Sequence, residues 1–177
     1  MTTPNQNSAE RPTLGHRTTK AAPGARGNTT TNAGLIEFQI QYRAVADLVL
    51  DPRNPRQHSQ NQVNQIADSI REFGFVMPIV VDHTGQVVIG HGRVLAARKL
   101  GMPRVPVVEI RHLSPAQLKA LRIADNRLAQ HAHWDERLLG ESFLELKELE
   151  LDFDLSITGF ALPEIDLTIQ KKRLEEI

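Results

Sequence analysis

The chain has 177 residues, of which 40% are hydrophobic and 24% are charged, and its formal net charge is zero. These values are ordinary for a soluble globular domain with extensions. Cysteine is absent, which excludes disulfides, thiolate metal sites and cysteine nucleophiles. No apolar run reaches the roughly 18 residues that span a bilayer, and the N-terminus carries no secretion signal. We therefore expect a cytoplasmic protein without a membrane partner.

The zero net charge hides a gradient along the chain. Residues 43–127 hold 12 Lys or Arg and 7 Asp or Glu, whereas residues 128–177 hold 5 and 12. A basic middle beside an acidic end indicates that an anionic ligand would bind the middle. For the counts alone, basic side chains that simply face solvent are the alternative.

Composition divides the chain into three parts. Residues 1–34 are rich in Thr, Asn, Gly, Pro and Ala and have almost no large apolar side chains. Such a stretch cannot offset the entropy of ordering it, so we predict a disordered tail. Residues 35–130 mix strand and helix patterns and predict an α/β (α+β) domain, and residues 131–177 predict a C-terminal helical extension.

The first regular elements are a strand and a helix. Alternating apolar side chains over residues 36–42 have the period of a half-buried strand. Two prolines then interrupt residues 51–56. Ser59 and Gln62 have the spacing of a capping box, apolar residues follow at helical spacing, and Gly74 stands where a left-handed C-terminal cap is expected.

Shorter elements follow in the centre of the chain. Apolar runs over residues 76–82 and 87–89 predict two strands joined by a hairpin-like turn. A short helix is expected over residues 94–100 and another strand over residues 105–110. The segment Ser-Pro-Ala-Gln at residues 114–117 combines a cap, a proline at the first helical position and a capping-box glutamine, and so predicts a further helix.

The acidic, leucine-rich end predicts a helix from about Asp135 and another from about Pro163. A helical cap on the preceding domain is the prediction, and a partner-binding helix pair is the alternative. His131 and His133 stand near Asp135 and Glu136, but residues two apart do not converge on one helix face. We therefore predict a polar turn here and no metal site.

The strongest chemical signal is the segment Gly90-His91-Gly92-Arg93 between a strand and a helix. A helix N-terminus presents unpaired backbone N–H groups, which with the helix dipole form an anion site. The glycines allow positive φ and a close approach to a phosphate, and Arg93 can add a charge-assisted hydrogen bond. The segment thus predicts a phosphate-binding loop; a tight turn that needs glycine only for its geometry is the alternative.

Three other residues are candidates for the same site. Arg56 follows a rigid Asn-Pro turn, and Asn126 and Arg127 lie towards the end of a predicted helix. Each alone is typical of a protein surface. Together they could surround the phosphates and base of a nucleotide.

The order of these motifs resembles the ParB N-terminal domain, also called the ParB/sulfiredoxin-like fold. The resemblance is carried by Asn54-Pro55-Arg56, Ser69-Ile70, Gly74, Pro78-Ile79-Val80-Val81, Gly90-His91-Gly92-Arg93, Ala96-Ala97, Leu100-Gly101, Val105-Pro106-Val107 and Asp125-Asn126-Arg127. It implies a compact domain with a small mixed sheet that binds a nucleoside triphosphate, CTP or ATP, with Mg²⁺. Family members typically work on DNA.

The resemblance also places the family's motifs. Its Gly-Glu-Arg-Arg phosphate loop falls on residues 90–93, its Glu-Asn-x-x-Arg box begins at Asp125, and its Gly-x-x-Gln-Pro box falls on residues 74–78, where Met77 replaces the glutamine. In the phosphate loop the chain has His91 and Gly92 instead of Glu and Arg. The sulfiredoxin reaction needs a cysteine and is excluded.

Segments 123–129, 134–136 and 156–160 are similar to ParB-like domains of phages and mobile elements, often fused to DNA methyltransferases. We expect a DNA-associated nucleotide-binding module. Its expected partners are DNA, a DNA methyltransferase or other phage or mobile-element protein, and a second copy of the chain. The alternatives are a nuclease or nucleoside triphosphate hydrolase, whose catalytic residues the sequence does not indicate, and a non-enzymatic subunit of a DNA methyltransferase.

Overall fold

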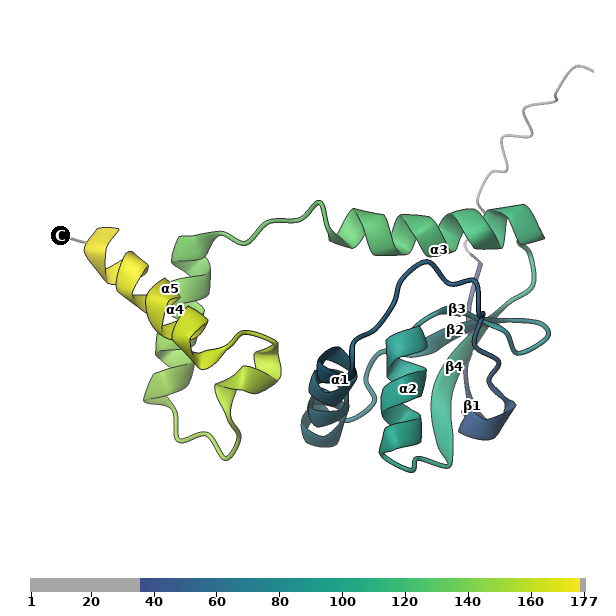
Figure 1. Cartoon of the computed structure of the whole chain (residues 1–177), viewed down its shortest axis with the longest axis horizontal. Coiled ribbons are helices and arrows are strands. Elements are labelled where there is room, and N and C mark those ends of the chain that lie inside the picture. Colours follow the sequence, from purple (N-terminus) through teal and green to yellow (C-terminus); the bar gives the residue numbers. More distant parts are fainter. Residues whose placement is uncertain (1–35, 176–177) are drawn as a thin grey trace, which may run out of the picture. The chain divides into compact units, whose positions relative to one another are not determined.

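The computed structural model describes residues 36–175, so the predicted tail over residues 1–34 lies outside the described residues. Figure 1 shows the arrangement of the elements. In chain order they are β1 (Ile40–Ala44), η1 (Val45–Asp47), α1 (Gln60–Phe73), β2 (Ile79–Asp82), β3 (Val87–Ile89), α2 (His91–Lys99), β4 (Arg104–Ile110), α3 (Pro115–Ala129), α4 (Glu136–Glu148), η2 (Leu155–Thr158) and α5 (Leu162–Glu175).

The strands form one mixed sheet in the order β1-β4-β2-β3. β1 pairs antiparallel with β4, β2 pairs parallel with β4, and β2 pairs antiparallel with β3. A parallel pair needs a crossover connection, which here runs through β3 and α2. The α/β class with a small mixed sheet is confirmed.

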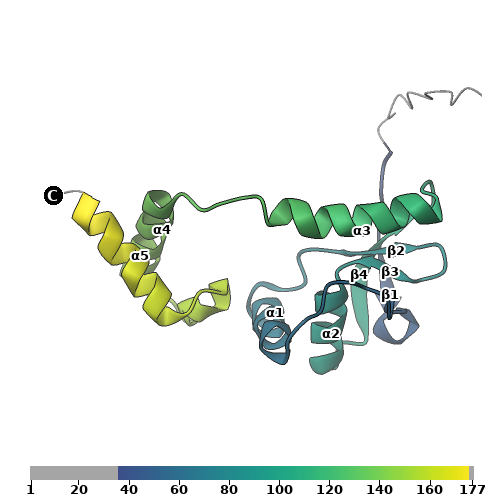
Figure 2. The same cartoon turned by 45° about the horizontal axis from the view of Figure 1, so that its top comes forward.

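The core of the domain lies between the sheet and α2. It contains Ile79 and Val81 of β2, Val105 and Val107 of β4, and Val94 of α2, all fully buried. Alternate residues of each strand face this core because side chains alternate across a strand. α1 and α2 lie side by side (Figures 1 and 2). This packing fixes the point at which β3 ends and α2 begins.

The first strand differs from its prediction. It begins at Ile40, and the alternating side chains of Ile36, Phe38, Ile40 and Tyr42 are 49–61% exposed instead of half-buried. β1 is an edge strand of the sheet, and these side chains lie outside the buried core. The alternation predicted the strand correctly but not which of its faces is covered.

The helix caps follow the sequence with one difference. Ser59 Oγ accepts a hydrogen bond from the Gln62 N–H, but the Gln62 side chain does not return the bond; its Oε1 lies 3.0 Å from Nδ1 of His58. At α3 the capping box of Ser114 and Gln117 is complete. The start of α1 is therefore joined to the preceding turn through His58.

The C-terminal helices have a core of their own. α4 and α5 pack around Phe143, Leu155, Ile165 and Ile169, and a Cβ at Gly140 would lie 3.0 Å from a backbone oxygen of α5. The two helices can approach closely because position 140 has no side chain. None of the helices among the described residues is both long and apolar enough to cross a membrane.

Candidate functional site

Gly90 forms the junction between β3 and α2. It is the N-cap of α2 with φ +101°, a conformation that L side chains rarely adopt, and no side chain caps the helix. α2 begins at His91 and not at Val94 as predicted, so Arg93 lies in the first turn. The uncapped N–H groups of this turn leave a site that favours an anion.

A cavity of about 270 Å³ opens at this N-terminus. We call it the loop cavity. It is lined by Asn54, Arg56, His58, Ile66, Val88, Ile89, Gly90, His91, Gly92, Arg93, Asp125, Asn126 and Ala129. The structure therefore brings the predicted residues of the loop together with Arg56 and Asn126, although they lie far apart in the sequence.

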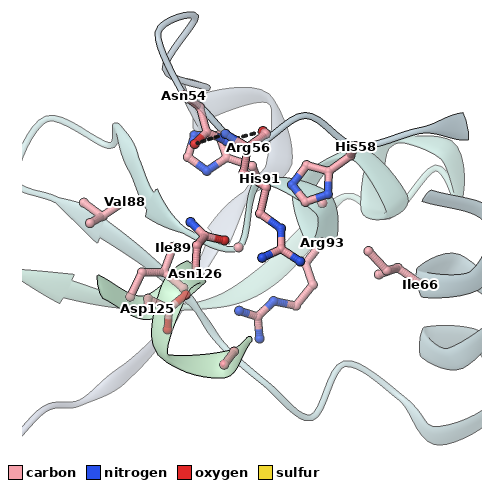
Figure 3. A pocket seen from close by; sticks show the side chains of 13 residues that line it. Asn54, Arg56, His58, Ile66, Val88, Ile89, His91, Arg93, Asp125 and Asn126 are labelled. Atoms are coloured by element: carbon pink, nitrogen blue, oxygen red, sulfur yellow. Dashed lines mark hydrogen bonds between the residues drawn. The ribbon is translucent and has the colours of Figure 1, made fainter. Parts of the chain in front are cut away.

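Two arginines from different segments converge in the loop cavity. Figure 3 shows the guanidinium groups of Arg56 and Arg93 pointing into the same space, with the Asn126 amide beside them. Within residues 36–175 neither guanidinium forms an ion pair with a carboxylate. Burial lowers the pKa of Arg93, and Asp125 acts in the opposite direction. Two like charges that lie together with no carboxylate in direct ion-pair contact, and with Asp125 as the one acidic residue among the described residues lining the cavity, favour an anionic ligand.

Hydrogen bonds position both arginines. Asn54 Nδ2 donates to the carbonyl oxygen of Arg56 at 3.0 Å, and the Arg56 N–H donates to Asn54 Oδ1 at 3.4 Å. Arg93 Nη1 donates to the carbonyl oxygen of Met77 at 3.0 Å. The turn before α1 thus fixes the backbone of Arg56, and the segment before β2 holds the guanidinium group of Arg93 directly.

His91 is a buried polar residue. The sequence placed it in the loop but did not predict its burial. Its side chain is only 7% exposed, and Nε2 has no hydrogen-bond partner within the part of the chain that the structure describes. Burial, then the nearby charges of Arg122 and His58, lower the pKa of His91 to about 4. The imidazole is therefore neutral at pH 7 and adds no charge to the loop.

The packing of α2 against α1 leaves no room for a side chain at Gly92. A Cβ at this position would lie 2.9 Å from Cδ1 of Ile66 and 3.1 Å from the His58 ring. Both distances are shorter than ordinary van der Waals contacts. The close approach of α2 to α1 excludes any side chain at position 92 unless those groups move.

Asn126 is hydrogen-bonded to the backbone of Arg122, whose side chain forms a buried ion pair that the sequence did not predict. Asn126 Nδ2 donates to the carbonyl oxygen of Arg122, and Arg122 Nη1 donates to Oδ2 of Asp51. Arg122 follows Leu118 by four residues, so helical spacing could have placed it on the face towards the sheet. His58 also lines the cavity and was not predicted, whereas Asp125, which lines it too, is the residue at which the resemblance places the start of the Glu-Asn-x-x-Arg box.

Arg127 does not line the loop cavity. Its Nη1 donates to the Oε1 of Gln130 at 3.2 Å, and it lines a neighbouring hollow of about 510 Å³ with Ile123. Arg56 and Asn126 line this hollow as well as the loop cavity. Arg127 therefore shares a hollow with these two predicted residues but does not reach the loop cavity, and its role in the site stays a prediction.

The histidines and acidic residues beyond α3 do not assemble a metal site among the described residues. Asp135 Oδ1 accepts a hydrogen bond from the Leu138 N–H at the start of α4. Glu136 pairs with Lys171 of α5. These carboxylates take part in the structure of the helical pair.

Residues 30–127 match the ParB N-terminal domain, the region that contains the loop, both converging arginines and Asn126. The chain belongs to this family. It is 40% identical over 81 residues to the ParB-like nuclease domain-containing protein YnaK of Escherichia coli, which covers 46% of this chain and 93% of YnaK.

Larger members of the family match over part of their length. The chain is 30% identical over 100 residues to the chromosome-partitioning protein Spo0J of Thermus thermophilus, which covers 54% of this chain and 35% of Spo0J. A solved structure of C-terminally truncated ParB from Caulobacter crescentus, complexed with CTP-γ-S, has a TM-score of 0.54 and 26% identity. That match covers 62% of this chain and 63% of the Caulobacter chain.

Proposed function

We propose that this chain is a nucleotide-binding module that works with DNA. In this proposal the loop Gly90–Arg93, together with Arg56 and Asn126, holds the phosphates of a nucleoside triphosphate. The observation that carries the proposal is the convergence of two guanidinium groups on the uncapped N-terminus of α2 (Figure 3). The similarity to the Caulobacter ParB complex with CTP-γ-S supports CTP as the first nucleotide to test.

The residues present fit a phosphate chain. Arginine guanidinium groups and helix N–H groups are the donors that phosphates prefer in proteins. Asp125 is the carboxylate among the residues lining the loop cavity, and Mg²⁺ commonly binds through one or two carboxylates together with the phosphates of its nucleotide. With a nucleotide bound, Mg²⁺ would be held by the phosphates together with the carboxylate of Asp125 and would neutralise part of the phosphate charge.

A thermal-shift assay tests the nucleotide half of the proposal. CTP and ATP, each with Mg²⁺, are expected to raise the midpoint of unfolding because a ligand that binds only the folded state stabilises it. Arg93→Ala should abolish the shift, and Arg71→Ala, an exposed arginine of α1 paired with Asp68, should preserve it. A wild-type protein that shows no shift with any nucleotide would overturn the proposal.

The DNA half is supported by the similarity to chromosome-partitioning proteins and by the excess of basic residues over residues 43–127. Fluorescence anisotropy with a labelled duplex, with and without CTP and Mg²⁺, is the test. Binding that weakens steeply with salt is expected because phosphate contacts release counter-ions. The absence of binding at low salt in both conditions would refute this half alone.

A second candidate function is DNA cleavage or nucleotide hydrolysis, favoured by the similarity to a ParB-like nuclease domain-containing protein. Metal-assisted cleavage generally uses several carboxylates near the phosphate, whereas the loop cavity offers Asp125. Mg²⁺-dependent nicking of a plasmid or release of phosphate by wild type, lost in Asp125→Asn, would favour this candidate.

The finer role that we propose is within a phage, mobile-element or DNA-modification system. The sequence similarity of residues 123–129, 134–136 and 156–160 to such proteins supports it. A DNA methyltransferase and a second copy of the chain are the proposed partners. Co-purification with a methyltransferase encoded beside the gene, and the mass in solution, test each partner separately.

A further inference from the structure

A second hollow adjoins the loop cavity. It has a volume of about 460 Å³, and Arg93 and Ile66 belong to the walls of both. We call it the side hollow. It is lined by Gln62, Gln65, Ile66, Ser69, Ile70, Gly74, Phe75, Val76, Met77, Arg93, Ile157, Thr158 and Gly159.

The two hollows differ in chemistry. The loop cavity has two guanidinium groups and a helix N-terminus, whereas the side hollow shares Arg93 but otherwise combines apolar side chains with amide and hydroxyl groups. Binding sites for small organic ligands are commonly apolar with a few polar groups and have about 300–1,000 Å³. The loop cavity, of about 270 Å³, lies just below this range. The adjoining side hollow offers further space for the base and sugar of a nucleotide whose phosphates lie at the loop.

The C-terminal extension forms one wall of the side hollow. Ile157 and Thr158 of η2 and the following Gly159 face the α1 side of the hollow. The extension contacts α1 next to this place, where the rings of Phe73 and Phe153 meet edge to face with centroids 5.7 Å apart. Such aromatic pairs contribute beyond their buried area and help to hold the turn in position.

The turn itself is ordered by local hydrogen bonds. Asp154 Oδ1 accepts from the Ser156 N–H at 2.7 Å, and Thr158 Oγ1 donates to the carbonyl oxygen of Leu155 at 2.7 Å. Leu155 is buried in the core of the helical pair. The wall is therefore built on a packed unit rather than on a free loop.

We propose that the C-terminal extension completes the ligand site, with its turn over residues 155–159 covering the base and sugar of a nucleotide whose phosphates lie at Gly90–Arg93. The inference rests on the proposed function. It implies that ligand binding and docking of the extension on α1 stabilise each other, because coupling between two binding events is reciprocal. The nucleoside part, not the phosphates, would then be read by the extension.

The test compares two ligands on the full chain: CTP, and inorganic tripolyphosphate, which lacks the base and sugar, each with Mg²⁺. Ile157→Ala should weaken CTP binding about tenfold, equal to 1.4 kcal/mol, and leave tripolyphosphate binding unchanged. Thr158→Ala is the second variant, since its side chain is exposed and its loss leaves the apolar core intact. Isothermal titration calorimetry measures both ligands.

Two matched controls locate the effect. Ile123→Ala removes the same atoms from the hollow on the other side of Arg56, and Leu167→Ala changes an exposed leucine of α5. Neither should alter the ratio of the two affinities. If Ile123→Ala weakens CTP while Ile157→Ala does not, the nucleoside lies in the other hollow and the inference is wrong.

The single tryptophan of the chain gives an independent readout. The Trp134 ring lies 5.7 Å from that of Phe160, the residue after Gly159. CTP should change Trp134 fluorescence and tripolyphosphate should not. Both ligands could bind and yet give the same Trp134 fluorescence and the same loss of affinity in Ile157→Ala. In that case the inference fails while the proposed function stands. If wild type binds neither ligand, both fail.

Discussion

Arg122 Nη1 of α3 lies 2.5 Å from Oδ2 of Asp51, and both side chains are at least 90% buried. The Asp51 Oδ1 also accepts from the Arg53 N–H at 2.9 Å, and Arg122 Nε lies 3.4 Å from the carbonyl oxygen of Val88 in β3. One ion pair therefore ties the turn that carries Arg56, the strand that leads into the loop, and the helix that carries Asn126.

Breaking this pair from one side should strongly destabilise the protein. Arg122→Met leaves Asp51 as a buried carboxylate without its cation, which typically costs about 3–5 kcal/mol. The double variant Asp51→Leu/Arg122→Met should lose less than Arg122→Met alone, because it leaves no buried charge. Urea unfolding measures both. Arg53→Ala is the control: Arg53 is exposed and lies 3.7 Å from Asp51, so it should cost less than about 1 kcal/mol.

Arg56 should be important for the ligand but not for the fold. Arg56→Ala is expected to weaken nucleotide binding by about ten- to a hundredfold, since a hydrogen bond to a charged group contributes about 1.5–3 kcal/mol. Without ligand, the midpoint of thermal unfolding should stay the same or rise, because the variant relieves repulsion between two converging cations. Calorimetric titration and thermal unfolding measure the two effects. A fall of several degrees in the unliganded midpoint would instead assign Arg56 a structural role.

Gly92→Ala should destabilise the packing of α2 on α1. The added methyl group overlaps Ile66 Cδ1, and overpacking of this kind costs about 1–3 kcal/mol. Ile66→Val removes that Cδ1 atom, so the double variant should be more stable than the sum of the two single effects predicts. A denaturant double-mutant cycle measures the coupling. Strictly additive effects would show that the clash is relieved elsewhere.

His91 should make the protein less stable in mild acid. Its pKa is about 4 in the folded state and about 6.5 in an unfolded chain, so the unfolded state binds more protons between these values. Stability is complete above pH 6.5 and falls as the pH drops towards 4, with a slope of at most about 1.4 kcal/mol per pH unit. Urea unfolding from pH 7.5 to 4.5 measures the slope.

The control for this prediction is His91→Gln, in which the slope over this window should be shallower than in wild type. Asp51 and Asp82 have pKa values below their ordinary value of 3.8. Their contribution is present above that value and is lost only at lower pH. An unchanged slope in the variant would show that another group carries the acid sensitivity.

The sequence was most informative where the signal is local. Glycines after an apolar run and before a helix predicted the junction at Gly90, and the Asn-Pro turn predicted a fixed position for Arg56. Capping residues at Ser59 and Ser114 placed the starts of two helices. Each of these inferences depends on residues within a few positions of one another, which share the same geometry in any fold.

Features that depend on distant segments were missed. In α3 the apolar side chain of Leu128 is 66% exposed, whereas the charged Arg122 is buried. Which helical face is covered depends on Asp51, far away in the chain. For the same reason the alternation of β1 could not show that its apolar side lies outside the core.

The geometry at Gly90 limits how this position can vary. A Cβ there would lie 3.2 Å from Nε and Nη2 of Arg93, so any replacement both strains the backbone and displaces that guanidinium. Every codon change that replaces glycine introduces a Cβ. In a saturation-mutagenesis library selected for ligand binding, we expect position 90 to tolerate no substitution, whereas Gly101, with open space around its Cβ position, should accept residues such as asparagine. Single substitutions at position 90 would then not change ligand preference during evolution. A new preference would have to arise from substitutions at the other residues that line the cavity.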